Sequence, residues 1–176
     1  MKKARKTAYA GLFTALCVAL LFLGSVIEVL DLSTAALGSL IIIAAMIELG
    51  KGYAIAVYAA ASLLSALLLP NKAPAVYFIL FSGYYPVLKV FLNNIKPKPL
   101  SYAARFAVFD IALAGAALVT VYLLNTPIEF EVYWWIAGIL LANGVFFVYD
   151  IALERMSLFY VRHIKSKFKY IFKGRR

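Results

Sequence analysis

Few side chains in this sequence have the types and spacings that catalysis or metal binding requires. The one cysteine, Cys17, lies in the first apolar segment, and the one histidine, His163, lies near the basic C-terminus. The sequence contains none of the motifs of zinc proteases, serine hydrolases or phosphate-binding loops. We therefore predict that the chain is not an enzyme, that it binds no metal or cofactor, and that Cys17 is a packing residue.

Four ionisable residues inside apolar segments are the main candidates for chemistry, because an unpaired charge in lipid costs several kcal/mol. They are Lys89, Asp110, Asp150 and Glu154, with Asp110 two turns into its segment. We expect Lys89 to form an ion pair with Asp110 or Asp150 that holds three helices together. Two alternatives remain open: the carboxylates could relay protons or ions, or the group could dock a cytoplasmic partner.

A second group of residues combines polar and aromatic side chains near the ends of apolar segments. Ring surfaces with a few placed polar groups are typical of small-molecule sites, although tryptophans also anchor proteins at membrane boundaries. Asn143 lies about three turns into the last apolar segment, where an amide needs a partner. We predict that this group lines an outward-opening substrate site. Its members are Asn71, Lys72, Asn125, Glu129, Trp134 and Asn143.

Long apolar segments must position these residues. Of the 176 residues, 65% are hydrophobic and 15% are charged, whereas soluble domains are about 45–50% apolar and about 25% charged. Six segments approach the ~20 apolar residues that a transmembrane helix needs. We predict an all-α integral membrane protein with a six-helix bundle over residues 1–158. The predicted spans are 7–28, 34–50, 52–69, 74–92, 102–124 and 132–158.

Basic residues mark one side of this bundle. They concentrate at the N-terminus, at Lys51, in the loop at 93–105 and in the tail, whereas the other loops carry Lys72 and four carboxylates. Basic loops stay in the cytoplasm, so we predict cytoplasmic termini in a bacterial cell membrane. The net charge of +10 then reflects topology, and no nucleic-acid partner is expected. The tail, residues 159–176, is predicted to be a basic amphipathic helix on the inner leaflet.

Two local features predict how the spans contact their neighbours. Pro86 removes a hydrogen bond from the fourth span and predicts a kink, and Gly83 allows another element to approach it. The first span carries a small-residue stripe, which permits close packing of another helix from this chain or from a different protein. The stripe consists of Ala8, Gly11, Ala15 and Ala19.

The six spans, the cytoplasmic termini and the sequence Ala15-Leu-Cys-Val-Ala19 resemble the substrate-binding S components of energy-coupling factor (ECF) vitamin transporters. In that family an Ala-x-x-x-Ala-type motif near the start of the first helix packs against a transmembrane coupling subunit. The resemblance implies that Gly11, Ala15 and Ala19 contact such a subunit. It also implies that a small solute is captured under the outer loops and released inside, driven by ATP that separate ATPases hydrolyse.

Two other classes of protein remain open. One is an MreD-like membrane scaffold of cell-wall elongation, which is similar in size and span number and would use the same stripe to recruit a partner. The other is a stand-alone ion- or proton-coupled carrier, with Asp110 and Asp150 as the coupling groups.

Overall fold

The computed structural model describes residues 3–122 and 132–164, together with the side chains of these residues except Glu28, 120–122, 132–135 and Ile164. Six of its helical segments are long and apolar enough to cross a membrane, and no strand occurs in the described ranges. For the described residues, the prediction of an all-helical chain with six helices long and apolar enough to span a membrane is therefore confirmed. The helices are α1 (Lys3–Val26), η1 (Glu28–Leu30), α2 (Asp31–Leu49), α3 (Lys51–Leu68), α4 (Ala73–Tyr77), η2 (Phe78–Ser82), α5 (Tyr85–Leu92), α6 (Lys98–Tyr122), α7 (Val132–Phe159) and η3 (Tyr160–Ile164).

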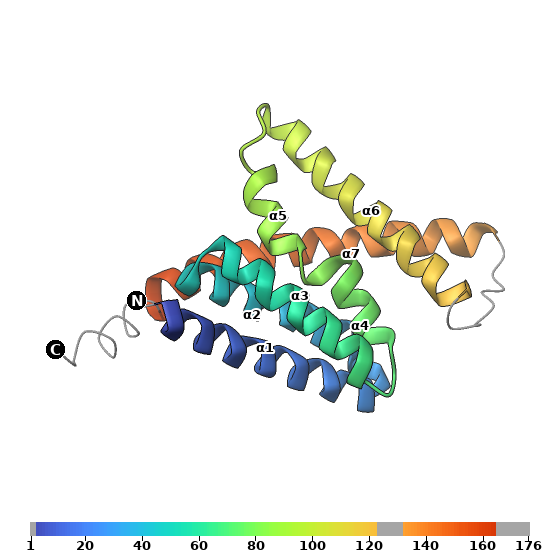
Figure 1. The fold of residues 1–176 in the computed structure, drawn as a ribbon. Helices are drawn as coiled ribbons and strands as arrows, with labels where there is room; N and C mark the ends of the chain where they lie inside the picture. Colours follow the sequence, from blue (N-terminus) through green and yellow to red (C-terminus); the bar gives the residue numbers. More distant parts are fainter. Residues whose placement is uncertain (1–2, 123–131, 165–176) are drawn as a thin grey trace.

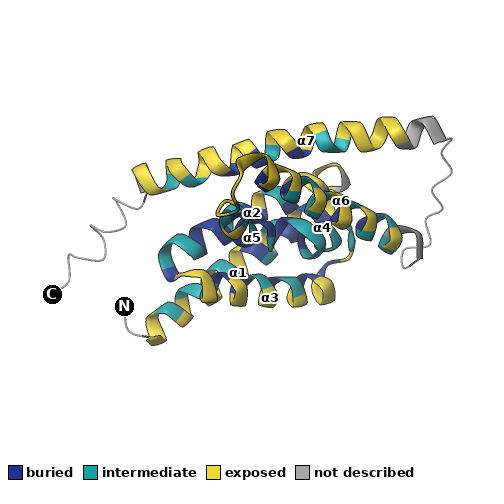
Figure 2. Ribbon diagram, turned by 90° about the horizontal axis from the view of Figure 1, so that it is seen from above, coloured by how far each residue is buried: buried dark blue, intermediate teal, exposed yellow. Residues whose placement is uncertain are grey.

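Helix α2 lies at the centre of the bundle (Figures 1 and 2). It contacts α1 and α3 on one side, α7 on the other, and the three pieces of the fourth span between them. Helix α6 runs obliquely across α7 (Figure 1), and little of it is buried (Figure 2). The bundle thus has a tightly packed N-terminal half and a more open half formed by α6 and α7.

Small residues allow the close contacts in the N-terminal half. A Cβ atom added at Gly24 would overlap Thr34, and one added at Gly38 would come within 3.0 Å of the Phe78 ring. Cys17 is fully buried beside Gly38, which confirms its predicted packing role. Because helices in lipid associate through van der Waals contact rather than hydrophobic drive, these close approaches stabilise the α1–α2 and α2–η2 contacts.

The fourth span is interrupted before the proline that predicted its kink. Residues Phe78–Ser82 form a π-helix, in which Gly83 donates a backbone hydrogen bond to Phe78 across 2.8 Å. Helix α5 then begins with Pro86 in its first turn, where the missing N–H is tolerated. The hydroxyl of Tyr58 donates to the Ile79 carbonyl within the π-helix at 2.8 Å. The predicted kink is therefore confirmed, and Tyr58 supports it.

The fifth span begins earlier than predicted. The sequence indicates a loop over 93–101, but α6 starts at Lys98, with Pro99 in its first turn. Proline suits that position because its fixed φ angle is helical and its missing N–H needs no partner there. The shift places Arg105 two turns inside α6 and Asp110 at the midpoint of that helix.

We predict that Gly83→Ala lowers the melting temperature of the purified protein in detergent. The new Cβ would overlap the Tyr58 ring and lie 2.9 Å from Phe78, and overpacking of this kind costs about 1–3 kcal/mol. Gly52→Ala is the matched control, because nothing lies within 4 Å of its Cβ position in the described chain and alanine favours a helix. Equal melting temperatures for the two variants would contradict the packing of Tyr58 on Gly83.

Candidate functional site

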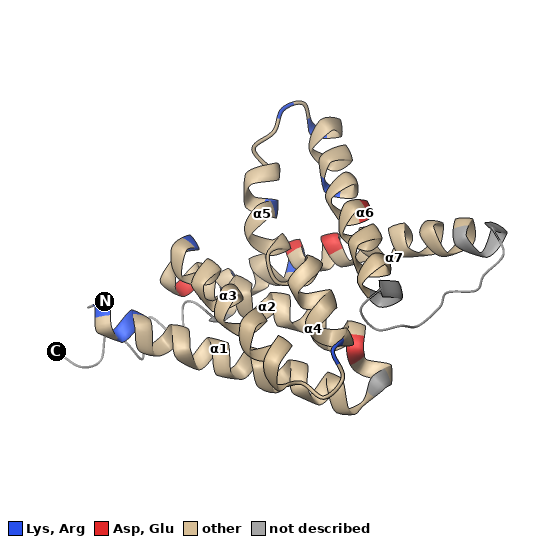
Figure 3. Ribbon diagram, turned by 45° about the vertical axis from the view of Figure 1, so that its right-hand side comes forward, with Lys and Arg blue, Asp and Glu red and all other residues tan. Residues whose placement is uncertain are grey.

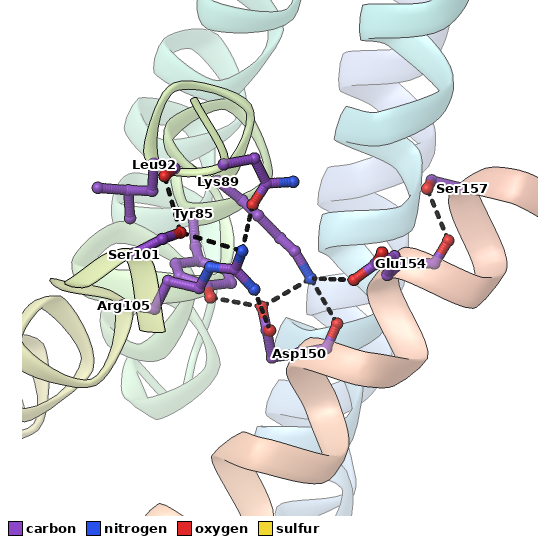
Figure 4. A network of polar contacts seen from close by, with 9 residues as sticks. Tyr85, Lys89, Leu92, Ser101, Arg105, Asp150, Glu154 and Ser157 are labelled. Atoms are coloured by element: carbon purple, nitrogen blue, oxygen red, sulfur yellow. Dashed lines mark hydrogen bonds and ion pairs between the residues drawn. The ribbon is translucent and has the colours of Figure 1, made fainter. Parts of the chain in front are cut away.

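A buried charged cluster joins α5, α6 and α7 (Figures 3 and 4). The Asp150 carboxylate lies 2.7 Å from Lys89 Nζ and 2.9 Å from Arg105 Nη1. Its Oδ1 atom also accepts a hydrogen bond of 2.6 Å from the Tyr85 hydroxyl. All three charged side chains are more than nine-tenths buried, so this carboxylate is held by two cations and a hydroxyl away from solvent.

The residues around Lys89 and Arg105 supply further hydrogen-bond acceptors and a second carboxylate. Lys89 donates a second hydrogen bond to the Asp150 backbone carbonyl at 2.6 Å, and half-exposed Glu154 lies 3.8 Å from the same ammonium. Arg105 Nη2 donates to Asn93 and, at 3.3 Å, to Ser101. Two cations therefore face two carboxylates, which is the condition under which buried ions are tolerated. The arrangement joins α5, α6 and α7 through Asp150, each of whose carboxylate oxygens contacts at least one cation.

The predicted partner of Lys89 is thus Asp150, and the alternative pairing with Asp110 is wrong. Asp110 instead accepts a hydrogen bond of 3.0 Å from the Asn143 side chain, which joins the middle of α6 to α7. Asn143 also donates to the Ile139 carbonyl at 3.0 Å. Each amide hydrogen of Asn143 therefore has an acceptor, as a polar group at this depth requires.

Arg105 is the member of the cluster that the sequence interpretation missed. The sequence interpretation assigns Arg105 to a basic loop at 93–105, although residue 105 already lies within the predicted span 102–124. The signal for the correct assignment is Pro99, since a helix that includes this proline in its first turn puts Ser101 and Arg105 one turn apart on the same face.

The residues of the predicted outer site are only partly brought together. Asn71 accepts a bond of 2.9 Å from the N–H of Ala73, the first residue of α4, and it donates to Asp31 at 3.3 Å. Lys72 donates to the Leu69 carbonyl at 2.6 Å, at the end of α3. Asn143 is bonded to α6 rather than to either of them. Asn125 and Glu129, together with the Trp134 side chain, lie outside the described residues.

A cavity of about 430 Å³ lies between α2, the fourth span, α6 and α7. Aromatic rings form much of its wall, including Phe81, Phe109 and Phe146, and the last two stack at 4.5 Å between centroids. Ser82 and Tyr149 contribute hydroxyl groups. Among the residues that the structure describes, none that lines the cavity is charged, and Asn71, Lys72 and Asn143 do not line it. The cavity is a candidate ligand site that the polar pattern of the sequence did not indicate.

The small-residue stripe lies on the exposed side of α1. Ala8, Gly11, Ala15 and Ala19 are all exposed, and a methyl group added at Gly11 would have no neighbour within 4 Å in the described chain. Leu12 and Leu16 beside the stripe are exposed by 63% and 56%. The internal contacts of α1 use the opposite face, with Cys17 and Leu21 fully buried.

Comparison of the chain with protein-family models, with curated proteins and with solved structures gives no match. The charged cluster, the cavity and the exposed stripe are the features of the described chain that bear on its function.

We predict that Asp150→Asn destabilises the protein strongly, because it leaves Lys89 and Arg105 buried without a full counter-charge. Breaking a buried ion pair by removing one partner costs about 3–5 kcal/mol. Glu154→Gln is the control, since the Glu154 side chain is 56% exposed and 3.8 Å from Lys89, and an exposed pair contributes about 0–1 kcal/mol. Melting temperatures in detergent measure both effects. A similar small loss for the two variants would show that Asp150 does not lock the helices.

We also predict that exchanging the two charges, as Lys89→Asp with Asp150→Lys, fails to restore the expression lost in the single variants. Arg105 lies 2.9 Å from the Asp150 carboxylate, so the new lysine would face a like charge in a buried place. The measurement is the yield of folded protein in membranes. Full recovery by the exchange would contradict the bond between Arg105 and Asp150.

Proposed function

We propose that this chain is a membrane subunit that captures a small solute and hands it to a separate ATP-driven coupling complex, as the S components of ECF transporters do. The observation that carries the proposal is the exposed small-residue stripe of α1. Small residues in a membrane helix serve close approach of a second helix. The described helices of this chain do not cover the stripe, so Gly11, Ala15 and Ala19 are free to contact another subunit.

The proposed orientation places both termini in the cytoplasm of a bacterial cell. The distribution of basic residues supports it, because the start of α1, the α2–α3 turn and the start of α6 carry lysines or arginines. Lys6 donates to the Leu49 carbonyl at the end of α2 across 3.4 Å, and the Lys51 ammonium lies 4.4 Å from the centre of the Phe91 ring. These contacts bring basic residues of α1 and α3 to the ends of α2 and α5.

In the proposed subunit, the cavity binds the solute and the charged cluster holds the helices in position. The cavity provides an apolar space with a few hydroxyl groups, which suits a small-molecule ligand. The cluster fixes the α5–α6–α7 arrangement that forms part of the cavity wall. In this proposal the ATPases of the coupling complex hydrolyse ATP, because the chain has no phosphate-binding loop.

The two alternative functions are less well supported. A stand-alone ion-coupled carrier needs carboxylates that bind and release ions, and Asp150 is already held by two cations and a hydroxyl. An MreD-like scaffold would also use the exposed stripe, but it has no need of the aromatic cavity. The cavity therefore favours the solute-binding subunit.

We predict that Ala15→Trp leaves the isolated protein folded and abolishes its co-purification with coupling partners. The bulky ring on an exposed face disturbs no internal contact, but it separates two helices that meet along the stripe. The protein is purified from its native membranes, and its partners are identified by mass spectrometry and by ATPase activity. Cys17→Trp, two residues away and fully buried, is the control that lowers the melting temperature. A clear loss of stability in Ala15→Trp would contradict the proposal, as would an ATPase complex that Ala15→Trp leaves intact.

A further inference from the structure

We propose that the exposed face of α6 around Asp110 binds a transmembrane helix of a different protein, and that this helix presents a lysine or arginine to the Asp110 carboxylate. The inference goes beyond the proposed function, because it concerns a different surface from the α1 stripe. It follows from the place of Asp110 in its helix, from its exposure, and from its contacts within the described chain.

Asp110 is an exposed carboxylate in the middle of a helix that can span a membrane. It lies at the midpoint of α6, and it does not line the described cavity between α2, the fourth span, α6 and α7. Carboxylates in membrane spans almost always face the bundle interior or a water-filled cavity, because hydrocarbon does not solvate them. The aspartate side chain is too short to reach the headgroups from this depth, as a lysine or arginine near a helix end does. Asp110 therefore needs a partner on its exposed side.

The contacts within the described chain do not neutralise this carboxylate. The Asn143 amide donates a hydrogen bond of 3.0 Å to its Oδ1 atom, but an amide supplies no charge. Lys89 and Arg105, the nearby cations of α5 and α6, both contact Asp150 instead. The connection between α6 and α7, residues 123–131, contains two glutamates and neither lysine nor arginine. The counter-charge is therefore expected from outside this part of the chain.

The missing counter-charge identifies the chemistry of the partner. A carboxylate away from water is stabilised most by a charge-assisted hydrogen bond from lysine or arginine, and their long side chains can cross the gap between two helices. A second copy of this chain is a poor source, because its Lys89 and Arg105 side chains are more than nine-tenths buried in the charged cluster. The partner is therefore a different membrane protein.

The surface around Asp110 allows another helix to come close. Ala107 and Ala114 lie three and four residues from Asp110, and both are exposed. These spacings place the three residues on one face of α6, and small residues let the backbone of a second helix approach within a membrane. In Figure 1, α6 lies on the upper side of the bundle and α1 on the lower side. The Asp110 face is therefore separate from the stripe.

The test uses the photo-cross-linking amino acid p-benzoylphenylalanine at two exposed positions. It replaces either Ile111, which follows Asp110 and is 74% exposed, or Leu67 in α3, which is 70% exposed and serves as the control. Membranes of the source organism that contain the full chain are irradiated, and cross-linked peptides are identified by mass spectrometry. We expect the probe at residue 111 to form an adduct with a transmembrane segment that contains a lysine or arginine. The probe at residue 67 should not form this adduct.

Variants test the role of the charge. Asp110→Asn should reduce the adduct about tenfold or more, because loss of one member of a desolvated charge pair weakens association strongly. Asp110→Glu keeps the charge and should retain most of the adduct. The melting temperature of purified Asp110→Asn should equal that of the wild type, since asparagine can still accept the hydrogen bond from Asn143. Replacing the basic residue of the partner by glutamine should cause the same loss, and this variant decides the matter if Asp110→Asn does not fold.

Five results would overturn the inference. The probe at residue 111 could form adducts with lipid alone, with a second copy of this chain, with residues 165–176 of the same chain, or with a segment that contains no basic residue. The fifth result is an adduct that Asp110→Asn leaves unchanged. Co-purification of ATPases, and its loss in Ala15→Trp, is measured separately on the same membranes. Failure of this inference is therefore distinguishable from failure of the proposed function.

Discussion

The position of α6 depends on one buried carboxylate. Little of α6 is buried, and its polar contacts to α7 include the Arg105–Asp150 ion pair and the Asp110–Asn143 hydrogen bond, with the Phe109–Phe146 stack between them. Asp150 also receives Lys89 and Tyr85 from α5, so it joins both sides of the α5–α6 turn to α7. Because α6 contributes one wall of the cavity, the shape of the cavity depends on this set of charges.

The six long apolar helices were predictable because they follow from composition. In the site, only the pairing of charged residues was predictable. Six apolar segments predict six spans because each must satisfy its backbone hydrogen bonds internally in lipid. The pairing of Lys89 with a carboxylate followed from the cost of an isolated ion. The cavity was not predictable, since its phenylalanines and alanines have the same polarity as residues that face lipid. These residues form a cavity wall only because of the angle at which α6 crosses α7.

Small residues on the same helix serve two different purposes, which the sequence cannot separate. Gly24 contacts Thr34 across the α1–α2 turn, whereas Gly11 and Ala15 face outward. Both kinds occur at spacings of three and four in α1. Their roles are decided by the rotation of α1 about its axis, and that rotation is set by contacts with α2 and α3 that are remote in sequence. In lipid, polarity does not fix this rotation as it does for a helix at a water surface.

The π-helix at Phe78–Ser82 has a consequence for the whole fourth span. Each residue of a regular helix advances about 100° around the axis, so one extra residue within a turn changes the direction in which every later side chain points. Without this insertion, Tyr85 and Lys89 would emerge about a quarter-turn away from α7. The π-helix therefore acts as a one-residue shift that turns Tyr85 and Lys89 toward Asp150 of α7, while both halves of the span keep their contacts with α2.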